Sequence, residues 1–385
     1  MGKRNKNSIY NRIHLNIQNA FERYIYTYYF QGQIIETPTK WIRFLCYEPS
    51  FAPTSIYQYA SNLKKLIIWI DNNPKFTNIN IDSVLKICTR KDLQEWILEM
   101  RGENLSPKTI RNKEATIKTF FQWLTIEEGN HTRLIDNHPY KSGRYISSKP
   151  ANSKPSYITE EEIIRLINGY YNEAERCLVH FLFDSGLRIT EAINLRCSDL
   201  PDENIFPDGL KYYPLRVRGV KGRGGNFKER ISLITSPVLA RIRRYHNSPE
   251  YRFTSFSNDL SKPVFLSVTG KKLTCRNINK QMKNAARRAG LIGTCSPHLL
   301  RHGAAFSILK SELGQTYLDK LVLIQKLFGH NQISTTEIYT CIPPAMLAKL
   351  NKDKVVVEKY TEAKRIYNNT YLALFKHKEK RGHSN

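Results

Sequence analysis

Cationic, imidazole and phenol side chains are grouped in two short segments near the end of the chain and in one segment further upstream. Residues 297–302 read PHLLRH, and residues 327–340 read LFGHNQISTTEIYT, which includes His330 and Tyr339. The upstream segment, SGLRITE, contains Arg188. Arginine binds phosphate through paired hydrogen bonds, imidazole transfers protons, and an activated phenol is a nucleophile. Together these groups are the ones needed to attack a phosphodiester without a metal ion.

Cleavage of DNA by a tyrosine makes three chemical demands. The phenol, with a pKa of about 10, must lose its proton as its oxygen attacks phosphorus. The transition state gathers negative charge on the non-bridging oxygens, which favours planar, bidentate cations. The departing 5′ oxygen then needs a proton. Because each preorganised donor contributes on the order of 10²–10³ in rate, or about 3–4 kcal/mol, we expect the fold to bring several such groups together.

A zinc site is the alternative interpretation of the segment PHLLRH. His298, Arg301 and His302 share one face if this segment is helical, and two histidines four residues apart can chelate zinc. The glutamate of an HExxH site is absent, however, and no third ligand is evident in the sequence. We therefore expect neither a metal ion nor another cofactor.

The composition indicates which class of molecule the protein binds. The chain has 385 residues, enough for two or three domains, and 60 Lys and Arg against 34 Asp and Glu give a net charge of +26. An excess of this size favours a polyanion, because neutralised phosphates release their counterions. We expect nucleic acid, with an RNA-binding protein or a basic peripheral membrane protein as the alternatives.

Cysteine usage and hydropathy indicate the compartment. The seven cysteines are scattered without a CxxC pair, which is typical of reduced thiols rather than a disulfide framework or a zinc site. The start is basic without an apolar signal core, and the apolar runs are too short to span a membrane. The sequence thus predicts a soluble, cytoplasmic protein with no membrane partner.

The elements that must position these groups form two main domains. We expect residues 1–35 to be a basic N-terminal segment, an arm or an extra helix around 16–30. Residues 36–145 have the periodicity of a helical domain, with helix starts at Pro53 and at Ser106-Pro107. Basic residues lie opposite the apolar stripes of both helices, and we expect these faces to contact phosphate rather than only solvent.

The second domain follows a linker. The predicted linker is residues 146–156, at the end of a stretch that is rich in Pro, Ser and Lys and has no periodicity. The second domain is predicted to span residues 157–344. Within it, Thr159 with the glutamates after it marks a helix start, 174–183 reads as a buried helix, and 212–220 and 227–234 read as strands. A basic C-terminal helix or tail is expected at 345–385, as a candidate contact to a second protomer.

Three strings carry a resemblance to a known family. FDSGLRITEAINLRCSDL, HLLRH and LFGHNQISTTEIYT resemble the catalytic boxes of the tyrosine recombinases, also called the phage-integrase family. The resemblance is strong over 157–342, weaker over 40–130 and absent at both ends. It implies a mainly α-helical fold with a small β-sheet: a helical core-binding domain and a mixed α/β catalytic domain that close on DNA as a C-shaped clamp.

The resemblance also implies a role for each group. Tyr339 would be the nucleophile that forms a 3′-phosphotyrosyl link, Arg188 and Arg301 would clasp the phosphate, and His298 and His330 would complete the pocket. Glu191 and His302 would support these groups.

The general acid in this family is a lysine at the turn of a β-hairpin. Here the hairpin reads GVKGRGGNFKER from Gly219, so Lys221 is the favoured match and Lys228 the alternative. Three features depart from the family pattern: Gly303, Phe328, and a slightly longer stretch over 306–325. They bear on local packing rather than on the reacting groups.

The implied activity is site-specific recombination of double-stranded DNA, integrating, excising or transposing a mobile element. A homotetramer would act on two DNA sites, with an accessory DNA-bending or directionality factor as a further partner. Two alternatives remain open: an enzyme like a type IB topoisomerase that relaxes DNA, and a non-catalytic DNA-binding regulator with this fold.

Overall fold

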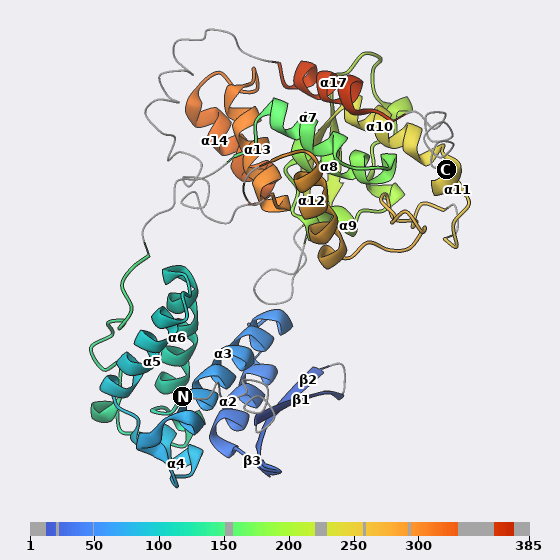
Figure 1. The fold of residues 1–385 in the computed structure, drawn as a ribbon. Helices are drawn as coiled ribbons and strands as arrows, with labels where there is room; N and C mark the ends of the chain where they lie inside the picture. Colours follow the sequence, from blue (N-terminus) through green and yellow to red (C-terminus); the bar gives the residue numbers. More distant parts are fainter. Residues whose placement is uncertain are drawn as a thin grey trace, which may run out of the picture. The chain divides into compact units, whose positions relative to one another are not determined.

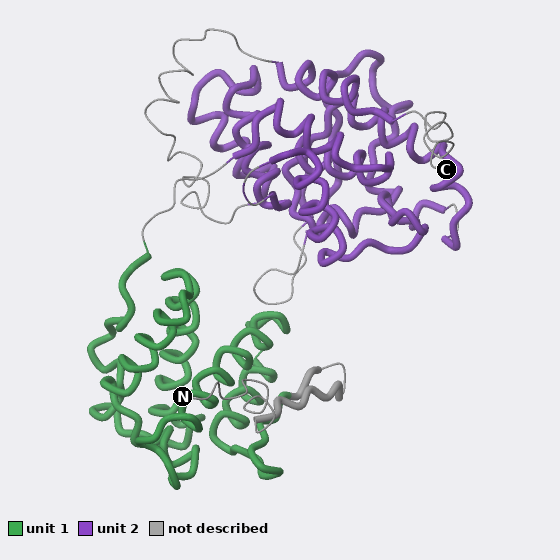
Figure 2. The backbone as a smooth tube through the Cα atoms, in the orientation of Figure 1, with its two compact units in different colours: residues 1–152, 223–225 green, residues 153–222, 226–385 purple. Residues whose placement is uncertain are grey.

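The computed structural model describes residues 13–20, 23–48, 50–150, 157–219, 229–256, 259–291, 293, 295–329 and 358–372, with side chains from residue 26 onward. The chain divides into two compact units (Figure 2). Unit 1 comprises residues 1–152 and 223–225, and unit 2 comprises residues 153–222 and 226–385. Both units consist mainly of helices, with two small antiparallel sheets among the described residues, and this confirms the predicted fold class.

Unit 1 begins with an antiparallel sheet in the order β1-β2-β3 (Figure 1). The strands are β1 (Ile13–Ala20), β2 (Arg23–Phe30) and β3 (Gln33–Ile34). The helix predicted around 16–30 is therefore wrong. The sequence of β2, RYIYTYYF, is rich in aromatic and β-branched residues, which fit a pleated surface. Tyr28 also anchors the strand, because its buried hydroxyl donates to the carbonyl of Ala60 over 2.8 Å.

The remainder of unit 1 is helical, as the periodicity predicted. Its helices are α2 (Glu36–Tyr47), α3 (Pro53–Asn72), α4 (Ile81–Ile87), α5 (Arg90–Gly102) and α6 (Pro107–Trp123), with short 3₁₀ turns at Pro74–Phe76, Glu127–Gly129 and Ile135–Asn137. The Ser106 hydroxyl caps α6 by accepting from the backbone N–H of Thr109. Trp41 and Phe120 meet edge to face in the core, 5.2 Å apart between ring centroids.

Unit 2 packs its helices around α8 (Glu173–Ser185), which is buried from Cys177 to its end. The others are α7 (Glu160–Asn168), α9 (Ile189–Ile193), α10 (Ser236–His246), α11 (Pro249–Arg252), α12 (Cys275–Arg288), α13 (Pro297–Lys310), α14 (Tyr317–Phe328) and α17 (Lys359–Thr370), with 3₁₀ turns at Cys197–Asp199 and Glu203–Ile205. Thr159 and Glu162 form a capping box at α7, which confirms that predicted helix start.

The strand pair of unit 2 consists of β4 (Tyr212–Val217) and β5 (Arg230–Thr235). They pair antiparallel, with Tyr212 opposite Thr235 and Val217 opposite Arg230. This confirms the two predicted strands, while residues 220–228 of the predicted hairpin lie outside the described residues.

The helix α17 packs against other helices of unit 2 (Figure 1, red). Ala363 and Ile366 are buried in the core of unit 2, and the guanidinium of Arg365 pairs with Glu160 over 2.6 Å. The helix contacts α7, α8 and α10. The contact to a second protomer, expected within 345–385, remains a prediction.

Candidate active site

The first predicted arginine follows a tight turn after α8. Gly186 ends that helix in the left-handed region with a φ of 63°, and a Cβ there would lie 2.3 Å from the Phe328 ring. Arg188 is the N-cap of α9, and its Nη1 donates to Glu191 Oε1 over 3.1 Å. Its side chain is 45% exposed. The turn thus directs a partly accessible guanidinium from a fixed backbone position.

The second predicted arginine, Arg301 on α13, is buried at 3% exposure. Its Nη1 donates to the carbonyl of Gly186 over 2.6 Å, and its Nη2 donates to the carbonyl of Phe328 over 2.8 Å. Arg188 Nη1 reaches the same Phe328 carbonyl at 3.4 Å. The structure therefore brings Arg188 and Arg301 together at one backbone oxygen, although they lie on different helices.

A third arginine, which the sequence did not single out, completes this cluster. Arg230, the first residue of β5, donates from both terminal nitrogens to the carboxylate of Glu191, over 2.8 and 2.9 Å. Its Nε donates to the carbonyl of Leu327 over 2.9 Å. We call Arg188, Arg230 and Arg301 the arginine cluster. The sequence carries a signal for it, since Arg230 ends the string KER, in which the prediction names only the lysine.

Glu191 links two members of the arginine cluster. Burial by itself raises the pKa of this carboxyl, yet the hydrogen bonds and charge of Arg230, together with Arg188, hold its pKa below the usual value. Glu191 also accepts from the backbone N–H of Arg188 over 2.8 Å. The ionised carboxylate thus fixes both the backbone and the side chain of Arg188, and the supporting role in catalysis stays a prediction.

All three arginines meet the C-terminal end of α14. The last carbonyls of a helix lack partners within the helix and carry partial negative charge. Here the carbonyls of Leu327 and Phe328 accept from the cluster. Gly329 then ends the helix with a φ of 64°, and a Cβ there would lie 3.1 Å from Arg230. The start of the segment that contains His330 and Tyr339 is thereby tied to the arginines.

The two histidines of α13 lie side by side. The rings of His298 and His302 are 4.5 Å apart between centroids, at 75° to each other. Burial, then the neighbouring charges of His298 and Arg301, lower the pKa of His302 to about 4. His302 is therefore neutral at pH 7. The side chain of His298, one turn earlier on α13, is exposed on the surface. Within the described part of the chain, no group of three or more His, Cys, Asp or Glu is placed to hold a metal ion.

Four predicted site residues lie outside the described residues: Lys221, Lys228, His330 and Tyr339. The described strands end at Val217 and begin again at Arg230, so the hairpin lysines fall between them. Their roles therefore remain predictions.

Two departures from the family pattern have a packing explanation. A Cβ at Gly303 would lie 2.7 Å from the ring of Phe183 and 2.8 Å from Ile158, so the backbone approach requires a residue without a side chain. Phe328 is fully buried and lies under the guanidinium of Arg301, 4.4 Å from Cζ to the ring centroid. Its bulk thus supports Arg301 rather than disturbing the cluster.

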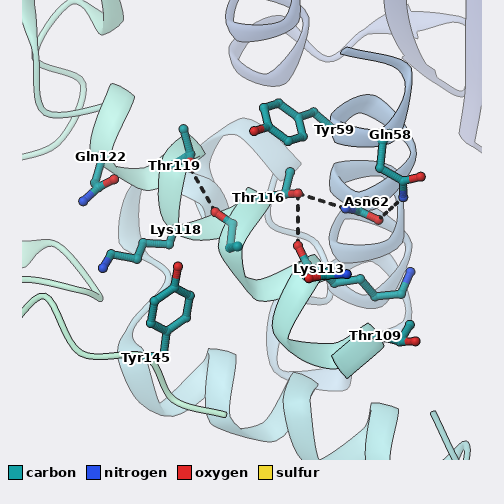
Figure 3. Close-up of a pocket in the computed structure, with 12 residues that line it drawn as sticks. Gln58, Tyr59, Asn62, Thr109, Lys113, Thr116, Lys118, Thr119, Gln122 and Tyr145 are labelled. Carbon is teal, nitrogen blue, oxygen red and sulfur yellow. Dashed lines mark hydrogen bonds between the residues drawn. The ribbon is translucent and has the colours of Figure 1, made fainter. Parts of the chain in front are cut away.

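A polar groove of about 670 Å³ lies between α3 and α6 of unit 1 (Figure 3). Asn62 at its base is buried, accepts from Gln58 over 3.0 Å and donates to Thr116 over 2.9 Å. Lys113, Lys118 and the Tyr145 ring also line it. We call this the α3–α6 groove, and its lining offers cations, amides and an aromatic face.

The lysines of α3 and α6 repel one another. Burial, followed by the charge of Lys65, lowers the pKa of Lys64, and the same two causes lower the pKa of Lys113. Glu103 offsets this for Lys113 only in part. An anion bound beside these ammonium groups would relieve the repulsion.

A second basic surface lies on α12 of unit 2. Its exposed cations Arg276, Lys280, Lys283 and Arg287 recur at helical spacing and so share one face, and the helix contains no Asp or Glu. Such a face suits the phosphates of a nucleic acid. No helix among the described residues has the length and apolar character needed to cross a membrane.

Comparison with known families matches most of the chain. Residues 156–344 match the phage integrase family, and residues 39–128 match the phage integrase N-terminal SAM-like domain. These two ranges correspond to the larger parts of unit 2 and unit 1.

Similar proteins include two named tyrosine recombinases. The XerC recombinase of Chlamydia caviae is 29% identical over 259 residues, covering 66% of this chain and 74% of the relative. The XerD recombinase of Staphylococcus haemolyticus is 25% identical over 322 residues, covering 81% and 95%.

Two solved structures share the fold. The Tn1549 transposon integrase (residues 82–397) in complex with circular intermediate DNA has 17% identity and a TM-score of 0.58, covering 83% of this chain and 98% of that one. A lambda integrase dimer bound to a COC′ core site has 15% identity and a TM-score of 0.57, covering 79% and 75%.

Proposed function

The chain belongs to the phage integrase family, the tyrosine recombinases, and from this premise we propose that it cuts and rejoins double-stranded DNA at specific sites. The observation that carries the proposal is the convergence of Arg188 and Arg301 on the Phe328 carbonyl. That oxygen belongs to the second residue of the segment 327–340, which contains the nucleophile candidate, so a phosphate bound by the arginines would lie near the start of that segment.

In the proposed reaction, the Tyr339 oxygen attacks a phosphodiester. The bond from this oxygen to phosphorus forms while the bond from phosphorus to the 5′ oxygen breaks. The phenol loses its proton, and the 5′ oxygen takes a proton from Lys221, with Lys228 as the alternative donor. The resulting 3′-phosphotyrosyl link keeps the bond energy, so a 5′ hydroxyl of another strand can reverse the step without ATP.

The arginine cluster would stabilise the charge of the transition state. Arg301 is buried and held by two carbonyls, and Glu191 holds Arg188, so both guanidiniums are oriented before substrate binds. Cations that are oriented before substrate binds need little reorganisation as charge develops. His298 and His330 would add hydrogen bonds to the scissile phosphate.

Double-stranded DNA is the proposed substrate, and both units would contact it. The α3–α6 groove and the cations of α12 offer phosphate contacts in unit 1 and unit 2 respectively. The similar Tn1549 transposon integrase was solved in complex with circular intermediate DNA, which supports the same partner here.

The proposed cellular task is integration, excision or transposition of a mobile element by a cytoplasmic enzyme. The fold shared with a transposon integrase and a phage integrase supports this task. A homotetramer would join two sites, and an accessory DNA-bending or directionality factor would select the direction.

Covalent trapping tests the proposal. The probe is a nicked duplex that contains the inverted repeats next to the gene of this protein. After cleavage, the short strand between the cut and the nick diffuses away, so the enzyme cannot rejoin the DNA and the covalent adduct persists. The native enzyme should give a covalent adduct in a denaturing gel, and Tyr339→Phe should give none. An unchanged adduct would overturn the nucleophile assignment. Site-independent relaxation of supercoiled plasmid would instead indicate a topoisomerase. Binding of the duplex without any covalent adduct would indicate a non-catalytic regulator.

A further inference from the structure

The end of unit 1, residues 139–147, is held against α5 and α6, and we call it the strap. Arg90 at the start of α5 donates to three of its carbonyls: Pro139 at 3.1 Å, Arg144 at 3.1 Å and Tyr145 at 3.2 Å. One arginine thus joins both ends of a turn that has no regular secondary structure. The strap is part of the folded unit, although its composition suggested an irregular stretch.

Glu114 on α6 makes the deepest contact with the strap. This carboxylate is 0% exposed and accepts from the backbone N–H groups of Ile146 and Ser147, the latter over 3.0 Å, and from the Ser147 hydroxyl. Burial of a carboxylate is costly unless hydrogen bonds compensate it. The strap supplies those hydrogen bonds, so Glu114 and the strap depend on each other.

Two cations of α6 also hold the strap, and the strap in turn orients them. Arg111 donates to the Ser147 carbonyl over 2.7 Å and stacks 3.5 Å above the centroid of the Tyr145 ring. Lys118 donates to the Gly143 carbonyl over 2.6 Å and lies 4.6 Å from the same ring. Figure 3 shows Lys118 beside Tyr145 at the α3–α6 groove. The strap therefore contributes Tyr145 to the lining of the α3–α6 groove, which is proposed to contact DNA.

These contacts set where the connection between the units begins. Ser147 is buried, and Tyr157 is the first described residue of unit 2, so nine residues, or ten Cα-to-Cα steps, lie between them. A chain of that length reaches at most about 35 Å. If the strap were released from Pro139, the connecting chain would reach about 60 Å.

We propose that Glu114 is a positioning residue that keeps the connection between the two units short, so that both units engage one DNA duplex efficiently. The inference rests on the proposed function, because it requires both units to contact the same DNA. For a two-part binder, the effective concentration of the second part falls roughly as the −3/2 power of tether length. Release of the strap should therefore weaken binding about two- to threefold.

The strap itself is tested without DNA, in the full chain. Glu114→Gln keeps the size of the side chain but places an amide donor against the donors of the strap. Trypsin should then cut faster after Lys141 and Arg144, with unit 1 still folded by circular dichroism. The control is Glu99→Gln, the same charge change at an exposed site on α5. Equal protection of Arg144 in both variants would overturn the anchoring role.

The effect on DNA binding is measured with a labelled, random-sequence duplex long enough for both units. Glu114→Gln should weaken binding about two- to threefold, and an insertion of about eight Gly and Ser residues after Ser153 should do the same while Arg144 stays protected. If Glu114→Gln is cleaved faster at Arg144 but neither variant changes the affinity for DNA, the proposal is overturned. A native chain that binds no DNA at all would instead contradict the proposed function.

If Glu114→Gln proves too unstable, Ser147→Ala provides a milder change. It removes only the hydroxyl that donates to Glu114. It should expose Arg144 to trypsin to a smaller degree, and no change in protection would count against the anchor.

Discussion

Two groups of cations in this molecule have opposite surroundings. In the arginine cluster of unit 2, protein oxygens already accept from every guanidinium: the carboxylate of Glu191 and the carbonyls of Gly186, Leu327 and Phe328. In the α3–α6 groove of unit 1, Lys113 lies close to the ammonium group of Lys65, and its pKa is lowered by burial and by that repulsion.

The difference separates two uses of positive charge. Guanidiniums fixed by acceptors present their hydrogen bonds in one geometry, which suits a transition state. Lysines that repel one another gain when an anion binds, which suits affinity for a phosphate backbone of any sequence. The comparison therefore predicts large effects on rate for changes in the cluster and small, salt-dependent effects on affinity for changes in the groove.

The largest effect is expected for Arg301→Lys. Lysine keeps the charge but cannot bridge the carbonyls of Gly186 and Phe328 with a planar fork. The rate of covalent adduct formation in a single turnover should fall by about 10²–10³. Arg252→Lys, at the exposed end of α11, is the matched control and should keep a rate close to that of the native enzyme. Equal rates for both variants would mean that geometry in the cluster is unimportant.

A smaller effect on rate is expected for Arg230→Lys. This change removes the paired hydrogen bonds to Glu191 and the contact with the Leu327 carbonyl. Arg188 and the end of α14 would lose their alignment, so the cleavage rate should fall about 10- to 100-fold while DNA affinity stays unchanged. A parallel loss of affinity and thermal stability, with the rate per bound complex intact, would show that Arg230 only supports the fold.

In the groove, Lys113→Gln should alter affinity rather than chemistry. Each phosphate contact that is lost should lower the slope of log K against log salt by about 0.9. Lys40→Gln is the control, because Lys40 pairs with Glu36 on the exposed face of α2. Binding of the two variants to the same duplex is compared across a salt series. Identical slopes would remove the groove from the DNA interface.

The smallest effect concerns His302 and the stability of unit 2. Its folded pKa of about 4 lies below the ordinary value of 6.5, so the unfolded chain binds more protons between these values. The contribution of His302 to the free energy of unfolding is therefore fully present above pH 6.5 and decreases as the pH falls toward 4. In His302→Gln, the melting temperature should therefore decrease less than in the native protein as the pH is lowered from 6.5 to 4. An unchanged pH dependence would show that burial and the charges of His298 and Arg301 do not keep His302 neutral.

Local patterns predicted many elements correctly. Ser106 and Thr159 cap helices α6 and α7 as expected, and the buried helix α8 and the strands β4 and β5 lie where hydrophobic patterns indicated them. The N-terminal prediction failed because apolar residues in RYIYTYYF fit helical spacing as well as a strand. Burial of Tyr28 against unit 1, together with pairing to β1, decided between them.

The sequence by itself determined the types of reacting group, their order and the family, because these depend on side-chain chemistry within short strings. Only the tertiary structure decided how they are held. Arg230, the carbonyls at the end of α14, the fit of Phe328 over Gly186 and the anchoring of the strap by Glu114 all join residues distant in the chain. Backbone carbonyls have no signature in a sequence, so which donor reaches them is settled only when the helices pack.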